Sequence, residues 1–266
     1  MLIKDLFFNK FKNGIPRPVG ENLTTLALQV NQANGLVPFK RLPETFTDRG
    51  DTVVSLWKLI REKQVVHIRG TPATGKSTLA RLLQQYVAMV VKEPEVYYVS
   101  WPENFDHLAP YSLMLNKLSG RTSDRDWLDI EGLLIVDEAQ ASYSSSLWND
   151  LIKFVELGFG LKIALFSSYG SASALVEDAS TSTPLMFEAD QRVSLKRSTN
   201  QPNLSLLLSR DEFQDLVHRR CESYGFAEPF LPPPPLIDRI FEITQGHASA
   251  STCALAVLSD SEVSIF

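Results

Sequence analysis

Apolar positions along the chain fall into two alternating patterns from residue 52 onward. Short runs rich in β-branched and aromatic residues predict strands, because these side chains suit a pleated, buried surface. Such runs lie at residues 64–69, 95–101, 133–137, 162–168 and 191–196. The run at 133–137, LLIVD, is almost continuously apolar. A continuous run is typical of a strand that is buried on both faces of a parallel sheet.

Between these runs, apolar residues recur at helical spacing. Helices are predicted over residues 52–63, 76–91, 111–120 and 145–158. Serines are available to cap the last of them at its start. Because strands and helices alternate, the segment 52–200 is predicted to be an α/β domain, with three layers and a mainly parallel sheet. The polar stretch 169–184 is expected to be a loop.

The chain changes character after residue 200. Three further helices are predicted, over residues 208–225, 229–246 and 248–260. The first has a Ser-x-x-Glu entry and a glycine exit, and four prolines lead into the second as an extended linker. Residues 201–266 therefore indicate a small helical subdomain that resembles a lid. It stops directly after its third helix, so a truncated lid is one interpretation.

Residues 1–51 form an N-terminal extension whose role the sequence does not give. Several turn signals break any long periodic segment there. The first fourteen residues mix lysines with leucine and phenylalanine at helical spacing, which favours a short amphipathic helix packed on the domain. They lack the uninterrupted apolar region of a secretory signal.

Composition narrows the class of protein. The 266 residues carry a net charge of −5, so the chain as a whole has no basic footprint for nucleic acid, although a local basic groove is compatible with that sum. The two cysteines, Cys221 and Cys253, lie in no metal-binding pattern and are expected to be small buried residues in a reducing compartment. No apolar run is long enough to span a bilayer. An intracellular protein, in the cytoplasm or nucleus, is favoured.

The stretch GTPATGKS fits the phosphate-binding pattern G-x-x-x-x-G-K-[ST] between a predicted strand and a predicted helix. In this pattern the loop wraps the phosphates of ATP with backbone N–H groups, the lysine reaches the β- and γ-phosphates, and the serine binds Mg²⁺. The predicted binding residues are Gly70, Thr71, Pro72, Ala73, Thr74, Gly75, Lys76, Ser77 and Thr78. The loop contacts only phosphates, so it does not reveal which base is bound.

A second motif, LLIVDEAQ, places two carboxylates at the end of a buried strand. We predict that Asp137 holds Mg²⁺ and that Glu138 orients and deprotonates the attacking water. Gln140 either does similar polar work or caps the following segment. The next strand ends in Ser167 and Ser168, where a polar side chain could sense the γ-phosphate or the attacking water.

An arginine is also expected to neutralise charge in the transition state. The candidates by position are Arg192, Arg197, Arg219 and Arg220, and the sequence does not choose among them. A second copy of the chain or a partner protein could supply such an arginine in trans. His247 lies between two predicted helices, where a capping role is favoured over chemistry.

Five stretches, taken in order, resemble a known family. They are VVHIRGTPATGKSTLARLL, YYVSWP, LLIVDEAQASYSSSLWNDLIK, IALFSSYGS and EITQGHAS. Together they resemble the P-loop ATPase module of Crinkler-type effector proteins of oomycetes, chytrids and other fungi, within the AAA+ and signal-transduction ATPases. The resemblance covers about residues 52–260. It implies an additional-strand, AAA+-like fold that binds and hydrolyses ATP, with Lys76, Ser77, Asp137 and Glu138 at the site and Ser167 or Ser168 as sensor.

The resemblance also implies a biological setting. In the family this module works as a regulatory switch or motor beside an effector domain. Secretion into a host is implied by this resemblance alone.

Two alternatives to the ATPase switch remain open. GTPATGKS with VDEAQ also resembles the first two motifs of superfamily 1 helicases, although FSSYGSA stands where their Gly-Asp…Gln element is expected and few residues remain for a second α/β domain. The other alternative is a nucleotide-binding switch with little hydrolysis.

Overall fold

The computed structural model describes residues 42–263, except residues 93, 107, 157, 169–186, 200, 202 and 224–230. The expected amphipathic helix at the N-terminus and the expected loop at 169–184 both lie outside the described residues.

Five parallel strands form one sheet in the order β2-β3-β4-β1-β5. They are β1 (Val65–Gly70), β2 (Glu95–Ser100), β3 (Gly132–Asp137), β4 (Lys162–Ser168) and β5 (Arg192–Val193). β4 lies between β1, which leads into the phosphate-binding motif, and β3, which carries the acidic pair. The predicted fold class is therefore confirmed, including the additional strand between these two.

The fifth strand is shorter than the predicted 191–196. The backbone of Ser194 and Leu195 accepts hydrogen bonds from the N–H groups of Leu206 and Leu207, at 3.0 and 3.1 Å. The chain thus leaves the sheet after Val193 and pairs with the linker that runs toward the C-terminal helices.

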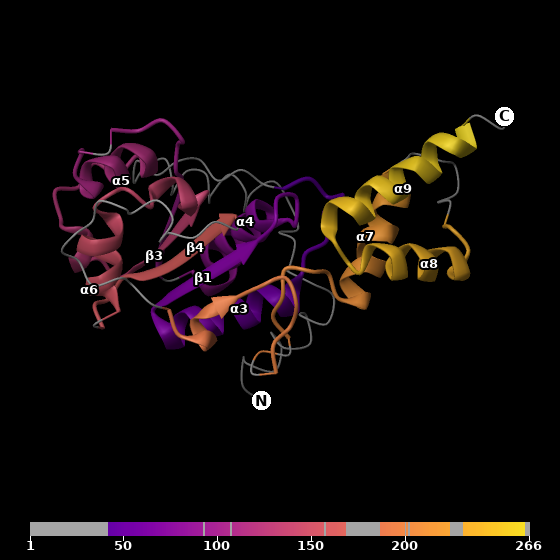
Figure 1. The fold of residues 1–266 in the computed structure, drawn as a ribbon, viewed down its shortest axis with the longest axis horizontal. Helices are drawn as coiled ribbons and strands as arrows, with labels where there is room; N and C mark the ends of the chain where they lie inside the picture. Colours follow the sequence, from indigo (N-terminus) through magenta and orange to yellow (C-terminus); the bar gives the residue numbers. More distant parts are fainter. Residues whose placement is uncertain are drawn as a thin grey trace.

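Helices cover both faces of the sheet (Figure 1). One face packs against α3 (Gly50–Lys63) and α4 (Lys76–Tyr86), in a cluster that includes Val66, Ile68 and Phe166. The other face packs against α5 (Tyr111–Ser119), the π-helical η5 (Leu147–Ile152) and α6 (Lys153–Val155). This arrangement is the three-layer core that the alternation of strands and helices predicted.

Two predicted helices depart from regular α geometry. The helix predicted over 76–91 continues after α4 as a π-helical turn, η2 (Val87–Val91), and the one predicted over 145–158 begins with η5. The expected serine cap is wrong. Ser146 has helical torsions rather than the extended ones a cap needs, and its Oγ accepts a bond from the N–H of Tyr111 at 3.2 Å instead.

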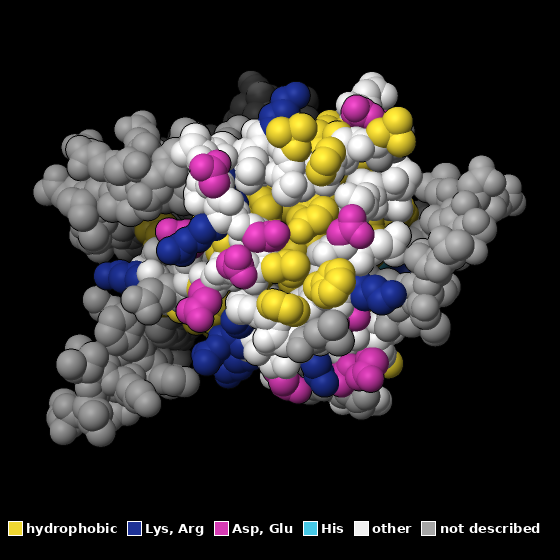
Figure 2. Space-filling view, turned by 90° about the vertical axis from the view of Figure 1, so that its left-hand side faces the viewer, with side chains coloured by type: hydrophobic (Ala, Val, Ile, Leu, Met, Phe, Trp, Pro, Cys, Tyr) yellow, Lys and Arg dark blue, Asp and Glu magenta, His cyan; other side chains and the backbone are white. Residues whose placement is uncertain are grey.

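The end of the molecule formed by α5 and α6 exposes apolar side chains among acidic ones (Figure 2). Leu113 of α5 is 62% exposed and Phe154 of α6 is 44% exposed. Among the described residues, no helix has the length and apolar character needed to cross a bilayer.

The C-terminal helices form a small layer of their own beside the core (Figure 1). They are α7 (Arg210–Ser223), α8 (Pro234–Thr244) and α9 (Ala248–Val263), which share a separate apolar cluster. The predicted capping box at the start of α7 is present. The Ser209 N–H donates to Glu212 Oε2 at 2.9 Å, and the Glu212 N–H donates to Ser209 Oγ at 3.1 Å.

The two cysteines have different environments. Cys221 is buried in the cluster of the C-terminal helices, as predicted. Cys253 is exposed, so the prediction that both are buried is wrong for this residue. It lies on α9 in a small-residue sequence whose apolar character is spread around the helix, so the pattern there did not reveal an inner face.

Candidate nucleotide site

The phosphate-binding motif forms the connection between β1 and α4, as predicted. Gly75 precedes α4 with φ +83°, in the left-handed region that glycine adopts without a steric penalty. Ala73 is also left-handed, with φ +64°. Thr74 Oγ1 donates to the carbonyl of Thr71 at 2.9 Å, which closes the loop on itself. The N-terminal end of α4 therefore begins at the loop, where it favours an anion.

Lys76 lies inside this loop and is 7% exposed. Its Nζ donates to the carbonyl oxygens of Thr71 at 2.8 Å and Gly70 at 3.2 Å. Burial lowers the pKa of Lys76, and the nearby Glu138 and Asp137 carboxylates act in the opposite direction. β1 and β3 run parallel on either side of β4, so the fold places the lysine of one motif and the acidic pair of the other at the same edge of the sheet.

Asp137 ends β3 and is 4% exposed. Its Oδ2 accepts a hydrogen bond from the Tyr98 hydroxyl at 2.7 Å, and its Oδ1 accepts one from the Glu138 N–H at 3.1 Å. Both donors are uncharged, and within the described part of the chain no salt bridge to Asp137 is present. A buried carboxylate that lacks a bonded cation, beside the helix that carries the Ser77 hydroxyl, offers the oxygen ligands that Mg²⁺ prefers.

Glu138 follows β3 with φ +54°, an uncommon conformation for a residue with a side chain. Gln140 donates from Nε2 to Glu138 Oε2, and its Oε1 accepts from the Ser168 N–H at 2.9 Å. Gln140 thus joins the candidate base to the end of β4. The sequence left two roles open for Gln140, namely a polar contact at the site and a cap for the following segment. The hydrogen bonds to Glu138 and Ser168 support the first.

Ser167 and Ser168 lie on opposite faces of the sheet, because successive side chains of a strand alternate. Phe166 packs with α3 and α4, so Ser168 shares their side, which is also that of the phosphate-binding loop. Ser167 is fully buried on the other side, where its Oγ lies 2.7 Å from His67 Nε2. The geometry therefore places Ser168, and not Ser167, beside the candidate site.

The partner of Ser167 is a histidine that the sequence did not single out. His67 lies in the middle of β1 against the rings of Trp148 and Phe187, at centroid distances of 6.0 and 5.1 Å. Burial, with smaller contributions from Arg69 and Arg192, lowers the pKa of His67 to about 3. His67 is thus a neutral core residue at ordinary pH.

The candidate arginines have structural partners. Arg219 forms ion pairs with Asp215 at 2.7 Å and Asp48 at 2.8 Å. Arg192 donates to the carbonyl of Phe187, and the Arg220 guanidinium lies 5.9 Å from the ring centroid of Phe46.

The fourth candidate arginine, Arg197, lines a cavity described below. The capping interpretation of His247 is supported, since its Nδ1 accepts a bond from the Ala250 N–H at 3.4 Å.

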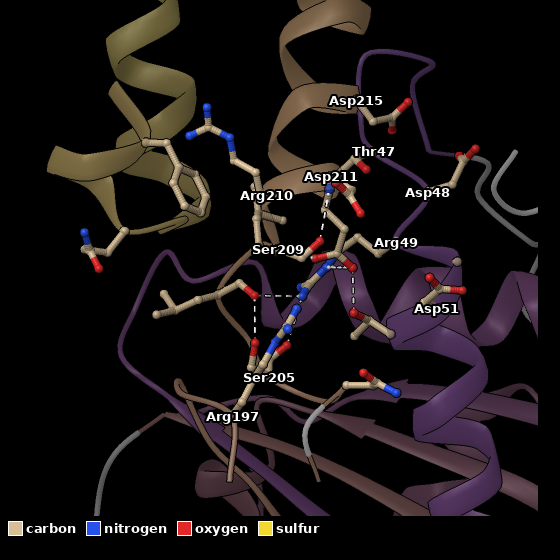
Figure 3. Close-up of a pocket in the computed structure, with 18 of the residues that line it drawn as sticks. Thr47, Asp48, Arg49, Asp51, Arg197, Ser205, Ser209, Arg210, Asp211 and Asp215 are labelled. Atoms are coloured by element: carbon tan, nitrogen blue, oxygen red, sulfur yellow. Dashed lines mark hydrogen bonds and ion pairs between the residues drawn. The ribbon is translucent and has the colours of Figure 1, made fainter. Parts of the chain in front are cut away.

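A cavity of about 1020 Å³ lies between the core and the C-terminal helices (Figure 3). Its walls come from the segment before α3 and the start of that helix, the linker after β5, α7 and α8. The linker also approaches the phosphate-binding loop, because a β-carbon placed on Gly70 would lie 2.4 Å from Leu206 Cδ1. At another point of the loop, Ser249 at the start of α9 donates from Oγ to the Ala73 carbonyl at 2.7 Å. Both the linker and the lid-like helices therefore contact this part of the chain.

Comparisons with known proteins add little to this geometry. Neither protein-family models nor curated protein sequences match the chain. Among solved structures, the chain is similar to a Walker-type ATPase of Pyrococcus abyssi, with a TM-score of 0.47 and 14% sequence identity over 84% of this chain and 72% of that one. The resemblance to Crinkler-type effectors stays a prediction.

Proposed function

We propose that this chain is an ATPase that binds Mg²⁺ and ATP and couples nucleotide binding and hydrolysis to movement of its C-terminal helices. The proposal rests above all on one observation. The phosphate-binding loop follows β1 and the acidic pair ends β3, and these two strands run parallel on either side of β4, so both motifs lie at the same edge of the sheet. In open α/β sheets, ligands bind at the carboxyl ends of the strands.

Each residue has a separate role in this proposal. The loop from Gly70 to Thr78 surrounds the phosphates, and the Lys76 ammonium exchanges its two backbone carbonyls for phosphate oxygens. Ser77 and Asp137 hold Mg²⁺, which when bound neutralises charge that develops on the phosphates. Glu138 accepts the proton of the attacking water. Ser168, at the end of β4, is the sensor that replaces the predicted pair of serines.

The nucleoside is proposed to occupy this cavity, which is lined by the linker that also approaches Gly70. Most of its lining is polar or charged, and Leu195, Leu207 and Leu208 with Phe241 offer apolar surface to a base. Since α8 contributes to the cavity and Ser249 of α9 bonds the loop, a bound nucleotide would contact the core and the lid at once. A change from triphosphate to diphosphate would then alter the lid position, which is the basis of a switch.

Two variants test the proposal. Lys76→Ala should lose ATP binding, measured by equilibrium titration with a fluorescent ATP analogue. Glu138→Gln should bind ATP with unchanged affinity and lose single-turnover hydrolysis by about a hundredfold or more, the lower range for loss of a general base. Hydrolysis by Glu138→Gln at the parental rate would show that the base is wrongly assigned.

The bridge from Gln140 to Glu138 favours a second candidate, a nucleotide-binding switch with little hydrolysis. In this form the carboxylate of Glu138 is held by Gln140 instead of being free for water. A chain of this kind would bind ATP tightly and show very slow hydrolysis in a single turnover. The Crinkler-like setting, including a partner or a second copy that supplies an arginine, belongs to the first candidate and awaits the same assays with added partners.

A further inference from the structure

Tyr98 is a buried tyrosine that the site so far does not use. It lies on β2, and its pair in the sheet is Ile135 of β3, two residues before Asp137. Its hydroxyl donates to Asp137 Oδ2 at 2.7 Å, and the residue is 8% exposed. Burial raises the pKa of Tyr98, and the Asp137 carboxylate raises it further.

The ring of Tyr98 is itself held in place. The Arg81 guanidinium lies 3.4 Å from the ring centroid, in the position of a cation–π contact. Arg81 lies four residues after Ser77 on α4, so the two side chains lie on the same side of that helix. The contact from Arg81 through Tyr98 to Asp137 therefore connects the helix that carries one proposed metal ligand to the strand that carries the other.

We propose that Tyr98 is a positioning residue for the metal site, and that its hydroxyl, supported by Arg81, holds the Asp137 carboxylate in the orientation that binds Mg²⁺. This inference rests on the proposed function, because it assumes that Asp137 is a metal ligand. Between them, Tyr98 and the Glu138 N–H restrain both oxygens of Asp137. Partners of this kind, one step removed from a metal, orient its ligands, and their loss typically weakens metal binding 10- to 100-fold.

The neighbouring Tyr97 offers a matched control. Its hydroxyl also donates to a carboxylate, that of Glu95, at 2.5 Å, and it is 5% exposed. It points to the opposite face of the sheet, where it packs against Trp127 at a centroid distance of 5.1 Å. Tyr97→Phe thus removes a similar hydrogen bond from the same strand without touching the proposed site.

The test measures Mn²⁺ binding to the full chain in the presence of ADP, by electron paramagnetic resonance of free Mn²⁺. Tyr98→Phe should raise the Mn²⁺ dissociation constant by about tenfold, and Tyr97→Phe should change it by less than about twofold. In EDTA, both variants should bind ADP with parental affinity, because the phosphate-binding loop is intact. Arg81→Met should raise the Mn²⁺ constant by a smaller factor of about two to five.

Three outcomes would overturn the inference. The first is a Tyr98→Phe variant that binds Mn²⁺ as the parent does. The second is a loss of ADP affinity in EDTA by that variant, which would indicate a general structural role. The third is a parent chain whose affinity for ADP is the same with and without Mn²⁺. Of the three outcomes, only this one would also overturn the proposed metal-dependent ATPase.

Discussion

Arg49 joins the core to the C-terminal helices, and its replacement gives the sharpest test of how the two parts are held. Arg49 lies just before α3 and is 4% exposed. Its guanidinium donates to the carbonyls of Ser205 at 2.9 Å, Leu206 at 3.2 Å and Leu207 at 3.4 Å. Its Nε also lies 3.4 Å from Glu212 Oε1, an ion pair with α7 (Figure 3).

The expected cost of Arg49→Met follows from these contacts. Methionine keeps much of the apolar stem but removes the Arg49 donor from the carbonyls of Ser205 and Leu206, while the Leu207 carbonyl keeps a hydrogen bond from Ser205 Oγ at 2.8 Å. It also removes the charge opposite Glu212. Breaking a buried pair on one side costs about 3–5 kcal/mol. Glu212 retains the Thr52 hydroxyl and the Ser209 N–H as donors, so we expect the lower end, about 3 kcal/mol. This is a large share of the 5–15 kcal/mol that typically stabilises a protein.

Urea unfolding measures this loss with two probes that report on different parts. The four tryptophans all belong to the core, at Trp57, Trp101, Trp127 and Trp148. Their fluorescence therefore follows the core, whereas far-UV circular dichroism also follows α7 to α9. Arg49→Met should lower the dichroism midpoint by about 1 M urea, for a slope of about 3 kcal/mol/M, and should lower the fluorescence midpoint less.

Arg239→Met is the control, since its ion pair with Glu242 is exposed, and it should cost less than about 0.5 kcal/mol. If Arg49→Met and Arg239→Met unfold alike, Arg49 does not hold the two parts together.

Three further results are expected. The pKa of His67 is about 3 in the folded chain and about 6.5 when unfolded, so only the unfolded chain takes up this proton as the pH falls below 6.5. The free energy of unfolding should therefore drop by about 2 kcal/mol from pH 7 to pH 5. In His67→Gln this part of the drop should be absent. Gly246→Ala should destabilise more than Gly158→Ala in thermal melts, since both glycines have positive φ but only at Gly246 would a β-carbon meet a backbone oxygen, at 2.3 Å. Ellman's reagent should label Cys253 in the native chain and Cys221 only after unfolding, and equal native rates would contradict the burial described for them.

The sequence predicted those elements of the fold that depend on residues close together in the chain. The strand predicted over 162–168 has the observed bounds, and the helix predicted over 111–120 ends at Gly120 in the left-handed conformation. Both depend on interactions within a few residues, namely a continuous apolar run and a glycine that follows a helix. The π-helical turns of η2 and η5 had no such signal, because a wide turn and an α-helical turn share nearly the same apolar spacing.

The site was predictable as a set of motifs but not as a set of contacts. Lys76, Asp137 and Glu138 belong to patterns whose chemistry fixes their roles, so their proximity was expected before the structure. Which of two adjacent serines faces the site depends on the register of β4 against β1, where Arg69 pairs with Ser167. A shift of one residue would turn the other serine toward the site. A strand that is apolar on both faces has no alternation of polar and apolar residues from which the register could be predicted.

The contacts that the sequence missed share one physical cause. From the sequence, Tyr98 indicated only a strand and Arg49 only a turn. Their partners lie 39 residues away for Tyr98 and more than 150 residues away for Arg49. Both are polar groups whose burial is tolerable only when those distant partners are present. A polar residue inside an otherwise buried stretch therefore signals a need for a hydrogen-bonding partner. For Tyr98 that partner is Asp137 of the candidate site, and for Arg49 the partners are the linker carbonyls and Glu212. The aromatic strand 95–101 thus indicated a contact as well as a strand. A buried tyrosine hydroxyl such as that of Tyr98 needs an acceptor, and the motif LLIVDEAQ had already placed the Asp137 carboxylate at the end of a strand.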